Sequence, residues 1–229
     1  MHALSRIISV LLLLLSSSEG GLASPALNNH NLDLETRQSA PAISRYCNPA
    51  TSICYLQYTW TPTVPVFRVA IPDTASTSTP FDTLLQITAP SSLGWVGFSW
   101  GGRMTLNPLT VVWPNGNSAT VSSRWANTRT QPSLYPQATY RTLSASRNAT
   151  HWTVEAVCSG CSAWSGGSGG LNPSGARTFA WAVSKTAVPQ PANTASSFSV
   201  HDSANTFQGD LSLAKVPKAA FDAYVRGGR

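Results

Sequence analysis

The side chain with the most distinctive chemistry in this chain is Met104, the only methionine besides Met1. It lies in a run rich in tryptophan and glycine, GWVGFSWGGRMTLNPLTVVWPNG, at residues 94–116. Because glycines carry no side chain, a bulky ligand or a second backbone can approach them closely. A thioether beside such a surface can bind a soft metal or haem iron. The alternative is that Met104 fills an irregular gap in the core, as most isolated methionines do.

The same run contains a candidate nucleophile, Ser99, in the pattern Gly97-Phe-Ser99-Trp-Gly101. This fits the G-x-S-x-G motif of hydrolases, and Ser99, Glu155 and His201 follow one another in the hydrolase order. That mechanism requires a strand, a sharp turn and a helix in a largely parallel sheet. No helical period follows Ser99, so a secreted serine esterase is the less favoured interpretation.

The chain contains four cysteines, Cys47, Cys54, Cys158 and Cys161. An even number in a secreted chain predicts two local disulfides, Cys47–Cys54 and Cys158–Cys161. The Cys-Ser-Gly-Cys pair could instead form a redox dithiol, but that chemistry belongs at the start of a helix, whereas this pair follows the strand pattern HWTVEAV. A four-cysteine zinc site is disfavoured outside the cell.

Residues 1–23 are typical of a secretory signal peptide. A basic start precedes an apolar run at residues 7–15, and small residues follow, so we expect cleavage near Ala23. Residues 24–45 are polar and lack periodicity, which indicates a pro-segment or a flexible N-terminal arm. The domain is therefore expected to occupy residues 46–229, outside the cell. No segment is long and apolar enough to span a membrane.

The composition is that of one secreted, β-rich domain. Charged residues make up only 10% of the chain, well below the usual quarter. The sequon Asn148-Ala-Thr150 predicts a glycan in an exposed turn. The net charge of +6 comes from scattered residues, which argues against nucleic-acid binding and predicts a mild attraction to acidic partner surfaces.

Short segments rich in Val, Thr, Trp and Tyr recur between clusters of turn residues, which favours an antiparallel β-sandwich. The expected strands are residues 53–60, 67–71, 83–88, 95–100, 109–113, 119–125, 140–144, 152–158, 178–184 and, with the weakest pattern, 198–201. One helix is expected at residues 218–225. The Gly/Ser run at 165–170 is expected to be a long hairpin loop and not a linker between domains.

Several motifs occur in one order: GWVGFSWGGRM, VVWPNGN, SSRWA, HWTVEAVCSGCSAW, FAWAVS and FSVHDSANTFQGDL. Together they resemble the haem b cytochrome domain of cellobiose dehydrogenase and its stand-alone secreted relatives, within the DOMON-like iron reductase domains. The likeness extends from about Tyr46 to Tyr224. It implies an all-β, antiparallel, immunoglobulin-like β-sandwich whose haem pocket is formed by loops at one end.

The resemblance also implies the two axial ligands of the haem iron, because the family's Met and His map onto Met104 and His201. Taken alone, a histidine in a loop is more often structural. As a ligand, His201 would be neutral and would donate its other ring N–H to a backbone carbonyl or to a carboxylate such as that of Asp202. No Cys-x-x-Cys-His is present, because Ser162 follows Cys161, so the haem is expected to be b-type and non-covalent.

Two further positions follow from the family's tyrosines near the haem propionates. They map onto Tyr135 and onto Arg129, and the second is a departure from the family pattern. An arginine can pair with a propionate at least as well as a tyrosine. The alternative is that Arg129 is a solvated surface residue, and the sequence favours neither.

Iron with both ligands bound has no open position, which favours electron transfer over oxygen chemistry. The implied function is a monomeric extracellular redox carrier, with ferric reductase activity left open. The sequence contains no flavin domain and no G-x-G-x-x-G. We therefore expect a separate donor, either a flavin dehydrogenase or a small reductant. The acceptor would be a copper polysaccharide monooxygenase or ferric iron.

A third interpretation is a haem-free carbohydrate-binding module, because the eight tryptophans could provide surfaces on which sugars stack. Such residues are more often core and pocket wall. A copper monooxygenase with its metal at the amino terminus is disfavoured, because the expected cleavage exposes no histidine there.

Overall fold

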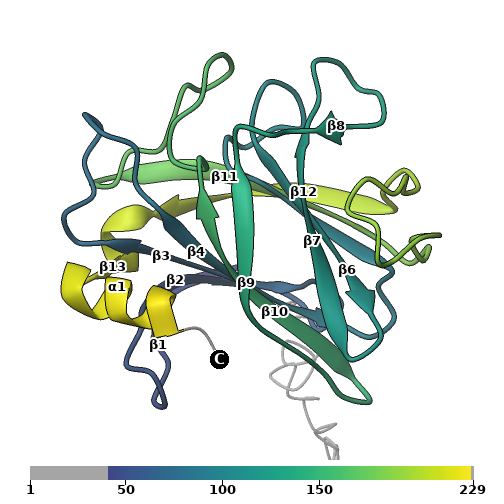
Figure 1. The fold of residues 1–229 in the computed structure, drawn as a ribbon, viewed down its shortest axis with the longest axis horizontal. Helices are drawn as coiled ribbons and strands as arrows, with labels where there is room; N and C mark the ends of the chain where they lie inside the picture. The colour runs from purple at the N-terminus through teal and green to yellow at the C-terminus, as the bar shows by residue number, and fades with distance from the viewer. Residues whose placement is uncertain (1–40, 228–229) are drawn as a thin grey trace, which may run out of the picture. The chain divides into compact units, whose positions relative to one another are not determined.

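The computed structural model describes residues 41–227, which form two β-sheets packed face to face (Figure 1). The first sheet has the order β1 (Ala42–Cys47), β2 (Cys54–Thr59), β3 (Val66–Pro72), β4 (Thr83–Pro90), β10 (His151–Ser159) and β9 (Thr139–Arg147). The second has the order β12 (Ser203–Asp210), β11 (Ala176–Ser184), β5 (Trp95–Ser99), β6 (Leu109–Asn115), β7 (Ser118–Trp125) and β8 (Ser133–Leu134). The short β13 (Lys215–Val216) adds to β3 in parallel, and the other pairs are antiparallel. The predicted antiparallel sandwich is confirmed.

Alternation along the strands decides what each face of the second sheet presents. In β5, Val96 and Phe98 belong to the main core between the sheets, where Phe98 meets Phe67 of the first sheet with ring centroids 5.4 Å apart. From β11, the indole nitrogen of Trp181 donates across the core to the hydroxyl of Tyr58 at 3.3 Å. The intervening residues of β5 and β11 therefore face away from the core, on the outer face of the second sheet.

The outer face of the first sheet is covered by the C-terminal part of the chain. After β12 the chain forms the short 3-10 helix η2 (Leu211–Ala214) and the helix α1 (Lys218–Gly227). Phe221 of α1 packs with Ile53 and Tyr55 in a second buried cluster. The buried carboxylate of Glu155 accepts hydrogen bonds from Tyr55 at 2.5 Å and from Tyr224 at 2.7 Å. This pairing attaches α1 to the sheet.

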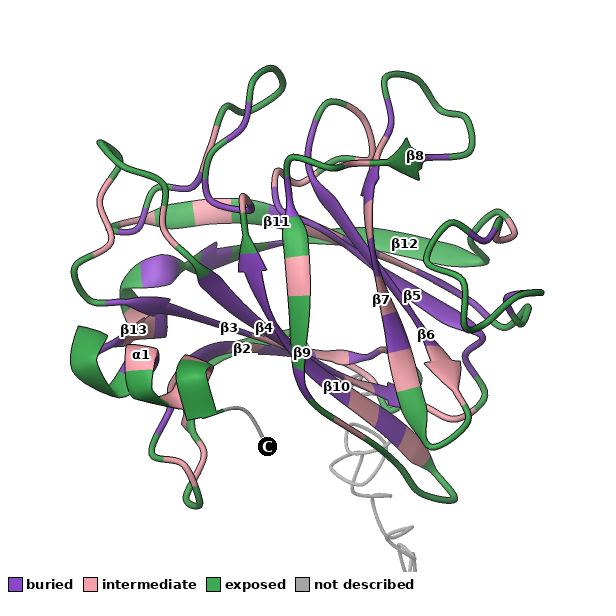
Figure 2. Cartoon of the chain, viewed as in Figure 1, coloured by how far each residue is buried: buried purple, intermediate pink, exposed green. Residues whose placement is uncertain are grey.

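Most strand predictions are confirmed, and one is wrong. The expected strand at 198–201 is wrong, because those residues form a loop and the strand β12 begins at Ser203. Strand β12 lies at a sheet edge, and only Phe207 and Gly209 of its residues are buried (Figure 2). It therefore lacks the regular apolar alternation on which the prediction depended. The expected helix is confirmed and extends to Gly227.

The first described strand begins earlier than the expected domain. Strand β1 starts at Ala42, before Tyr46, so the sheet includes residues of the expected N-terminal arm. The expected signal peptide at 1–23 and the arm up to residue 40 lie outside the described residues. Among residues 41–227, no helix combines the length and apolar character that a membrane span requires.

Both predicted disulfides are confirmed, Cys47–Cys54 and Cys158–Cys161. The first joins β1 to β2 at a residue pair that is also in register between the two strands. With all four sulfurs in disulfides, neither the dithiol nor the zinc interpretation holds.

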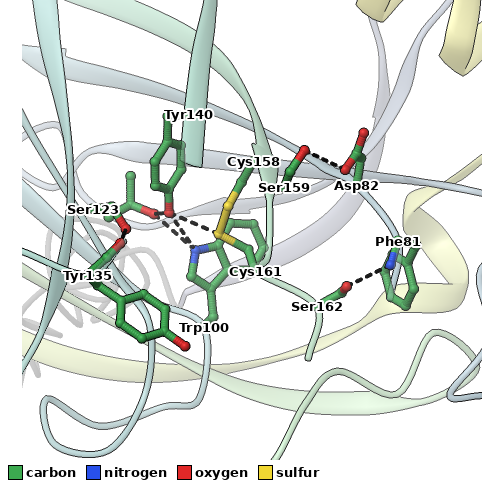
Figure 3. The surroundings of a disulfide bond; sticks show 11 residues. Phe81, Asp82, Trp100, Ser123, Tyr135, Tyr140, Cys158, Ser159, Cys161 and Ser162 are labelled. Atoms are coloured by element: carbon green, nitrogen blue, oxygen red, sulfur yellow. Dashed lines mark hydrogen bonds between the residues drawn. A yellow bond between two sulfur atoms is a disulfide. The ribbon is translucent and has the colours of Figure 1, made fainter. Parts of the chain in front are cut away.

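The second disulfide lies beside a buried polar group (Figure 3). The Tyr140 hydroxyl is 3.0 Å from the Cys161 sulfur and also contacts the hydroxyl of Thr110. It accepts a hydrogen bond from the Trp100 indole at 3.3 Å. Desolvation by burial is the main cause that raises the pKa of Tyr140, to about 12, and the hydrogen bonds from Thr110 and Trp100 partly oppose it.

This pKa predicts a loss of stability in alkali. An unfolded tyrosine ionises near its ordinary pKa of 10.0, whereas folded Tyr140 keeps its proton to about pH 12. The contribution of Tyr140 to the free energy of unfolding is therefore fully present below about pH 10. The free energy of unfolding should fall by about 2 kcal/mol as the pH rises from about 10 to 12. Urea unfolding of Tyr140→Phe should show a shallower decline over this range, and the remaining decline comes from Tyr55, Tyr58 and Tyr135, whose pKa values burial also raises. An equally steep decline in Tyr140→Phe would contradict the assignment.

Candidate functional site

A cavity of about 540 Å³ lies over the outer face of the second sheet. Small residues of three neighbouring strands form its floor, namely Gly97 of β5, Ala180 and Ala182 of β11, and Ala204 of β12. Because these side chains are so short, a flat ligand can lie almost directly on the backbone of the sheet. The loops expected from the sequence wall this cavity, but its sheet floor was not anticipated.

Met104 reaches the cavity from the loop between β5 and β6. The buried Asn107 shapes this turn, because its side-chain amide donates to the backbone oxygens of Thr105 at 2.8 Å and of Arg103 at 3.4 Å. These two carbonyls belong to the residues on either side of Met104. The hydroxyl of Ser99 also donates to the Arg103 oxygen, at 2.6 Å. The half-buried thioether is thus carried by a turn that is held on both sides.

Two glycines allow this turn to form. A Cβ at Gly101 would lie 1.7 Å from the side-chain oxygen of Asn107. Any other residue at position 101 would therefore displace the Asn107 amide that holds the turn. Gly102 has a φ of +78°, in the left-handed region that glycine adopts readily. The GG before Met104 is therefore a backbone requirement of the turn.

His201 reaches the same cavity from the loop between β11 and β12. The carboxylate of the next residue, Asp202, accepts hydrogen bonds from the Lys185 backbone N–H at 2.7 Å and from the Ser184 hydroxyl at 3.2 Å. The Asp202 backbone N–H donates to the Val183 oxygen at 2.8 Å. Asp202, which the sequence suggested as a partner of the imidazole, thus fastens the loop to the end of β11.

The preceding residues of this loop are held by aromatic contacts. Phe198 packs edge-on against Trp95, with ring centroids 5.0 Å apart. The indole nitrogen of Trp95 donates to the hydroxyl of Ser199 at 3.1 Å. Both Phe198 and Trp95 line the cavity, so the contacts that hold the histidine loop also form part of the wall.

A buried arginine joins two of the loops that wall the cavity. The guanidinium of Arg124, on β7, donates to the backbone oxygens of Thr194 at 2.7 Å and Ser196 at 2.6 Å in the β11–β12 loop. It also donates to the Pro132 oxygen at 3.0 Å in the β7–β8 loop. Burial lowers its pKa. The partners of this positively charged guanidinium are thus backbone carbonyl oxygens, where a buried arginine often has a carboxylate.

The structure separates the two positions expected near the propionates. Arg129 lines the cavity and is exposed at its rim, as is Arg103. Tyr135 is not among the lining residues, and its ring stacks on Trp125 with centroids 4.8 Å apart. Within the described chain, no Asp or Glu lines the cavity, so its rim is positively charged.

The hydrolase alternative is wrong. Ser99 and His201 both line the cavity, but Glu155 belongs to the other sheet, where it bonds to Tyr55 and Tyr224. Ser99 ends a strand that is followed by a loop and by another antiparallel strand, not by a helix. The three residues therefore cannot form a triad, and the nucleophile elbow is absent.

The sugar-stacking alternative loses its main support as well. Most of the eight tryptophans are buried, namely Trp95, Trp100, Trp113, Trp152, Trp164 and Trp181, and the other two are half-buried. Without exposed indole faces there is no open platform on which a sugar ring could stack.

The lining suits a flat, largely apolar group that contains a soft metal. The floor is apolar and free of large side chains, and one thioether and one imidazole reach the space from separate loops. Arginines at the rim can pair with acidic groups of such a ligand. Within residues 41–227, no three His, Cys, Asp or Glu residues cluster as a metal site. Met104, His201 and Arg129, which the sequence singled out as candidates, all line this cavity, whereas the supporting roles of Asn107 and Arg124 were not predicted. The sequence signal for Asn107 is a polar residue within the stretch TLNPLTVV, and that for Arg124 is its place in the motif SSRWA.

Comparison with known proteins gives concordant matches. The family model for the cytochrome domain of cellobiose dehydrogenase matches residues 46–222. A pyrroloquinoline quinone-dependent pyranose dehydrogenase from Coprinopsis cinerea is 33% identical over 141 residues, which is 60% of this chain but only 19% of that protein.

Two solved structures share the fold. The cytochrome b domain of pyranose dehydrogenase from Coprinopsis cinerea has a TM-score of 0.74 and 26% identity, covering 82% of this chain and 96% of that chain. The cytochrome domain of Myriococcum thermophilum cellobiose dehydrogenase has a TM-score of 0.72 with the same coverage. At 22% identity, the second likeness concerns the fold alone.

The role of Arg124 can be tested by Arg124→Gln. The change leaves buried carbonyls in two loops without their donor, at about 1–3 kcal/mol for each group. We expect the free energy of unfolding in urea to fall by about 3 kcal/mol or more. The matched control Arg147→Gln, at an exposed position, should change it by less than about 0.5 kcal/mol. Equal stability of the two variants would refute the role of the guanidinium.

Proposed function

Because this chain belongs to the family of the cytochrome domain of cellobiose dehydrogenase, we propose that it binds a non-covalent haem b in the cavity over the second sheet and transfers single electrons. Such a haem supplies a one-electron couple between ferric and ferrous iron. The observation that carries the proposal is that Met104 and His201, from loops far apart in sequence, line one cavity. These two side chains are the proposed axial ligands.

The residues around the cavity have separate tasks in this proposal. The thioether of Met104 and the imidazole of His201 would together hold the haem iron, which would leave no site for oxygen and would favour electron transfer. The Asn107 clamp and the Asp202 contacts hold the two ligand loops, so little rearrangement is needed on binding. Arg129 at the rim pairs with a propionate, the role that the sequence left open. Tyr135, away from the lining, is expected to support Trp125 and not to touch the propionates.

The proposed partners are redox proteins or small redox reagents. The chain spans 19% of the length of the curated relative it matches, so the dehydrogenase activity in that protein's name is not carried over. We propose that electrons arrive from a flavin dehydrogenase or a small reductant. They would leave to a copper polysaccharide monooxygenase or to ferric iron. The positive rim favours partners with acidic surfaces at the cavity mouth.

The proposed location is extracellular. Two disulfides among the described residues suit an oxidising compartment. The sequon residue Asn148 is exposed in the turn between β9 and β10, where a glycan would meet no obstacle from the sheets. Its side-chain oxygen accepts a hydrogen bond from the Thr150 hydroxyl at 3.1 Å. We propose that Asn148 is glycosylated and that the protein acts as a monomer.

The absorption spectrum of the purified protein, before and after dithionite, tests the cofactor. We expect a Soret band and, on reduction, sharp α and β bands from low-spin, six-coordinate iron. His201→Ala should lose most of its haem, whereas Met104→Ala should keep the fold and a weakly ligated haem. The matched control His151→Ala, beside the sequon, should keep the parent spectrum. A folded protein that stays colourless with excess haem would sink the proposal and favour the carbohydrate-binding alternative.

A further inference from the structure

We propose that a second cavity, of about 360 Å³, binds a small polyhydroxylated carboxylate, and that this site is coupled to the turn that carries Met104. The cavity lies between the loop that follows β3, the glycine-rich loop at 165–170 and the start of β11. Its volume is near the lower end of the range of about 300–1,000 Å³ for small-molecule sites, which indicates a ligand the size of one sugar unit. The coupling rests on the proposed haem function, whereas the binding does not.

The only charged residue in the lining of this cavity is the half-buried Arg177. Its guanidinium donates to the backbone oxygen of Ser168 at 3.1 Å, which leaves further N–H groups for a ligand. Among residues 41–227 it forms no ion pair. The nearby Asp210 instead caps η2 by accepting from the Ser212 N–H. A single cation without a carboxylate partner matches a ligand with one negative charge.

The rest of the lining is polar but uncharged. It includes hydroxyls from Ser76, Thr77, Thr79 and Ser162 and the amide of Asn172. Such groups both donate and accept hydrogen bonds, so they match a ligand that carries several hydroxyls. No aromatic side chain lines this cavity within the described chain, which disfavours a ligand that binds by ring stacking. A sugar acid satisfies both the charge and the hydroxyls.

A chain of hydrogen bonds joins this cavity to the Met104 turn. The hydroxyl of Ser168, in the cavity wall, donates to the side-chain oxygen of Asn107 at 2.9 Å. The amide nitrogen of Asn107 in turn donates to the carbonyls on both sides of Met104. A ligand that moves Arg177 or Ser168 therefore acts on the clamp that holds the thioether.

Backbone packing makes this link tight. A Cβ at Gly167 would lie 2.0 Å from the Leu106 oxygen and 2.9 Å from the Asn107 side-chain oxygen. The glycine-rich loop thus touches the Met104 turn with no side chain between them. Because closely packed backbone leaves no free space, a shift of the glycine-rich loop displaces the Met104 turn.

Sodium gluconate is the probe for binding, with glucose as the neutral analogue and sodium sulfate as the anion without hydroxyls. Calorimetric titration of the purified full chain should show saturable gluconate binding, with both analogues at least about tenfold weaker. Arg177→Gln should weaken gluconate binding roughly tenfold or more, whereas the matched Arg147→Gln should not. Thr79→Val, which removes one lining hydroxyl and no charge, should weaken it less, and thermal unfolding checks that each variant is folded. Absence of binding, no effect of Arg177→Gln, or sulfate binding as tightly as gluconate would overturn the site.

The coupling has its own test on the haem-loaded protein. By thermodynamic reciprocity, a ligand that alters the ferric–ferrous equilibrium must bind the two oxidation states with different affinity. We expect gluconate Kd values that differ by about fivefold or more between oxidised and reduced protein. Ser168→Ala, whatever its effect on the gluconate affinity itself, should bring the two Kd values together, and Ser174→Ala should leave their ratio intact. Identical Kd values in both states would refute the coupling. The absorption spectrum of the same sample separates that result from a failure of haem binding.

Discussion

The arrangement of the candidate site depends on the buried guanidinium of Arg124. The loops it joins connect the two strand pairs at opposite ends of the second sheet, β7–β8 and β11–β12. Neither loop contains regular structure that would hold it in place. A guanidinium can satisfy several carbonyls at once because its donors form a rigid planar fork. It thereby replaces the water that these carbonyls would otherwise need, and it lets irregular chain form a closed wall beside an apolar cavity.

The second sheet has two different faces because the pleat directs alternate residues to opposite sides. Its inner face carries Phe98, Phe179 and Trp181, which build the core with the first sheet. Its outer face carries glycine and alanine at the neighbouring positions. The large residues stabilise the sandwich, and the small ones leave the space over the sheet free. The same strands therefore stabilise the core and form the cavity floor, because different side chains serve the two purposes.

The loops that carry Met104 and His201, the two proposed ligands, are held by different kinds of contact. Around Met104, an amide clamp and two glycines determine the path of the backbone, whereas around His201 a carboxylate and aromatic packing fasten a longer loop. The clamp at Met104 is also linked to a polar cavity through Ser168. Of the two loops, the one that carries Met104 is thus the one with a hydrogen-bonded link to a second cavity.

The sequence by itself determined the alternating strands, the disulfide pairing within short loops, and the motifs that made Met104 and His201 candidates. These are local properties, or patterns of several motifs in order. It did not reveal strand β12, whose exposed edge position leaves only Phe207 and Gly209 buried, nor the stacking of Tyr135 on Trp125. Only the tertiary structure decided which residues form the floor, because this depends on the register between neighbouring strands. Likewise, the roles of Asn107 and Arg124 follow from carbonyls of other residues that the fold brings within hydrogen-bonding distance, which no local pattern encodes.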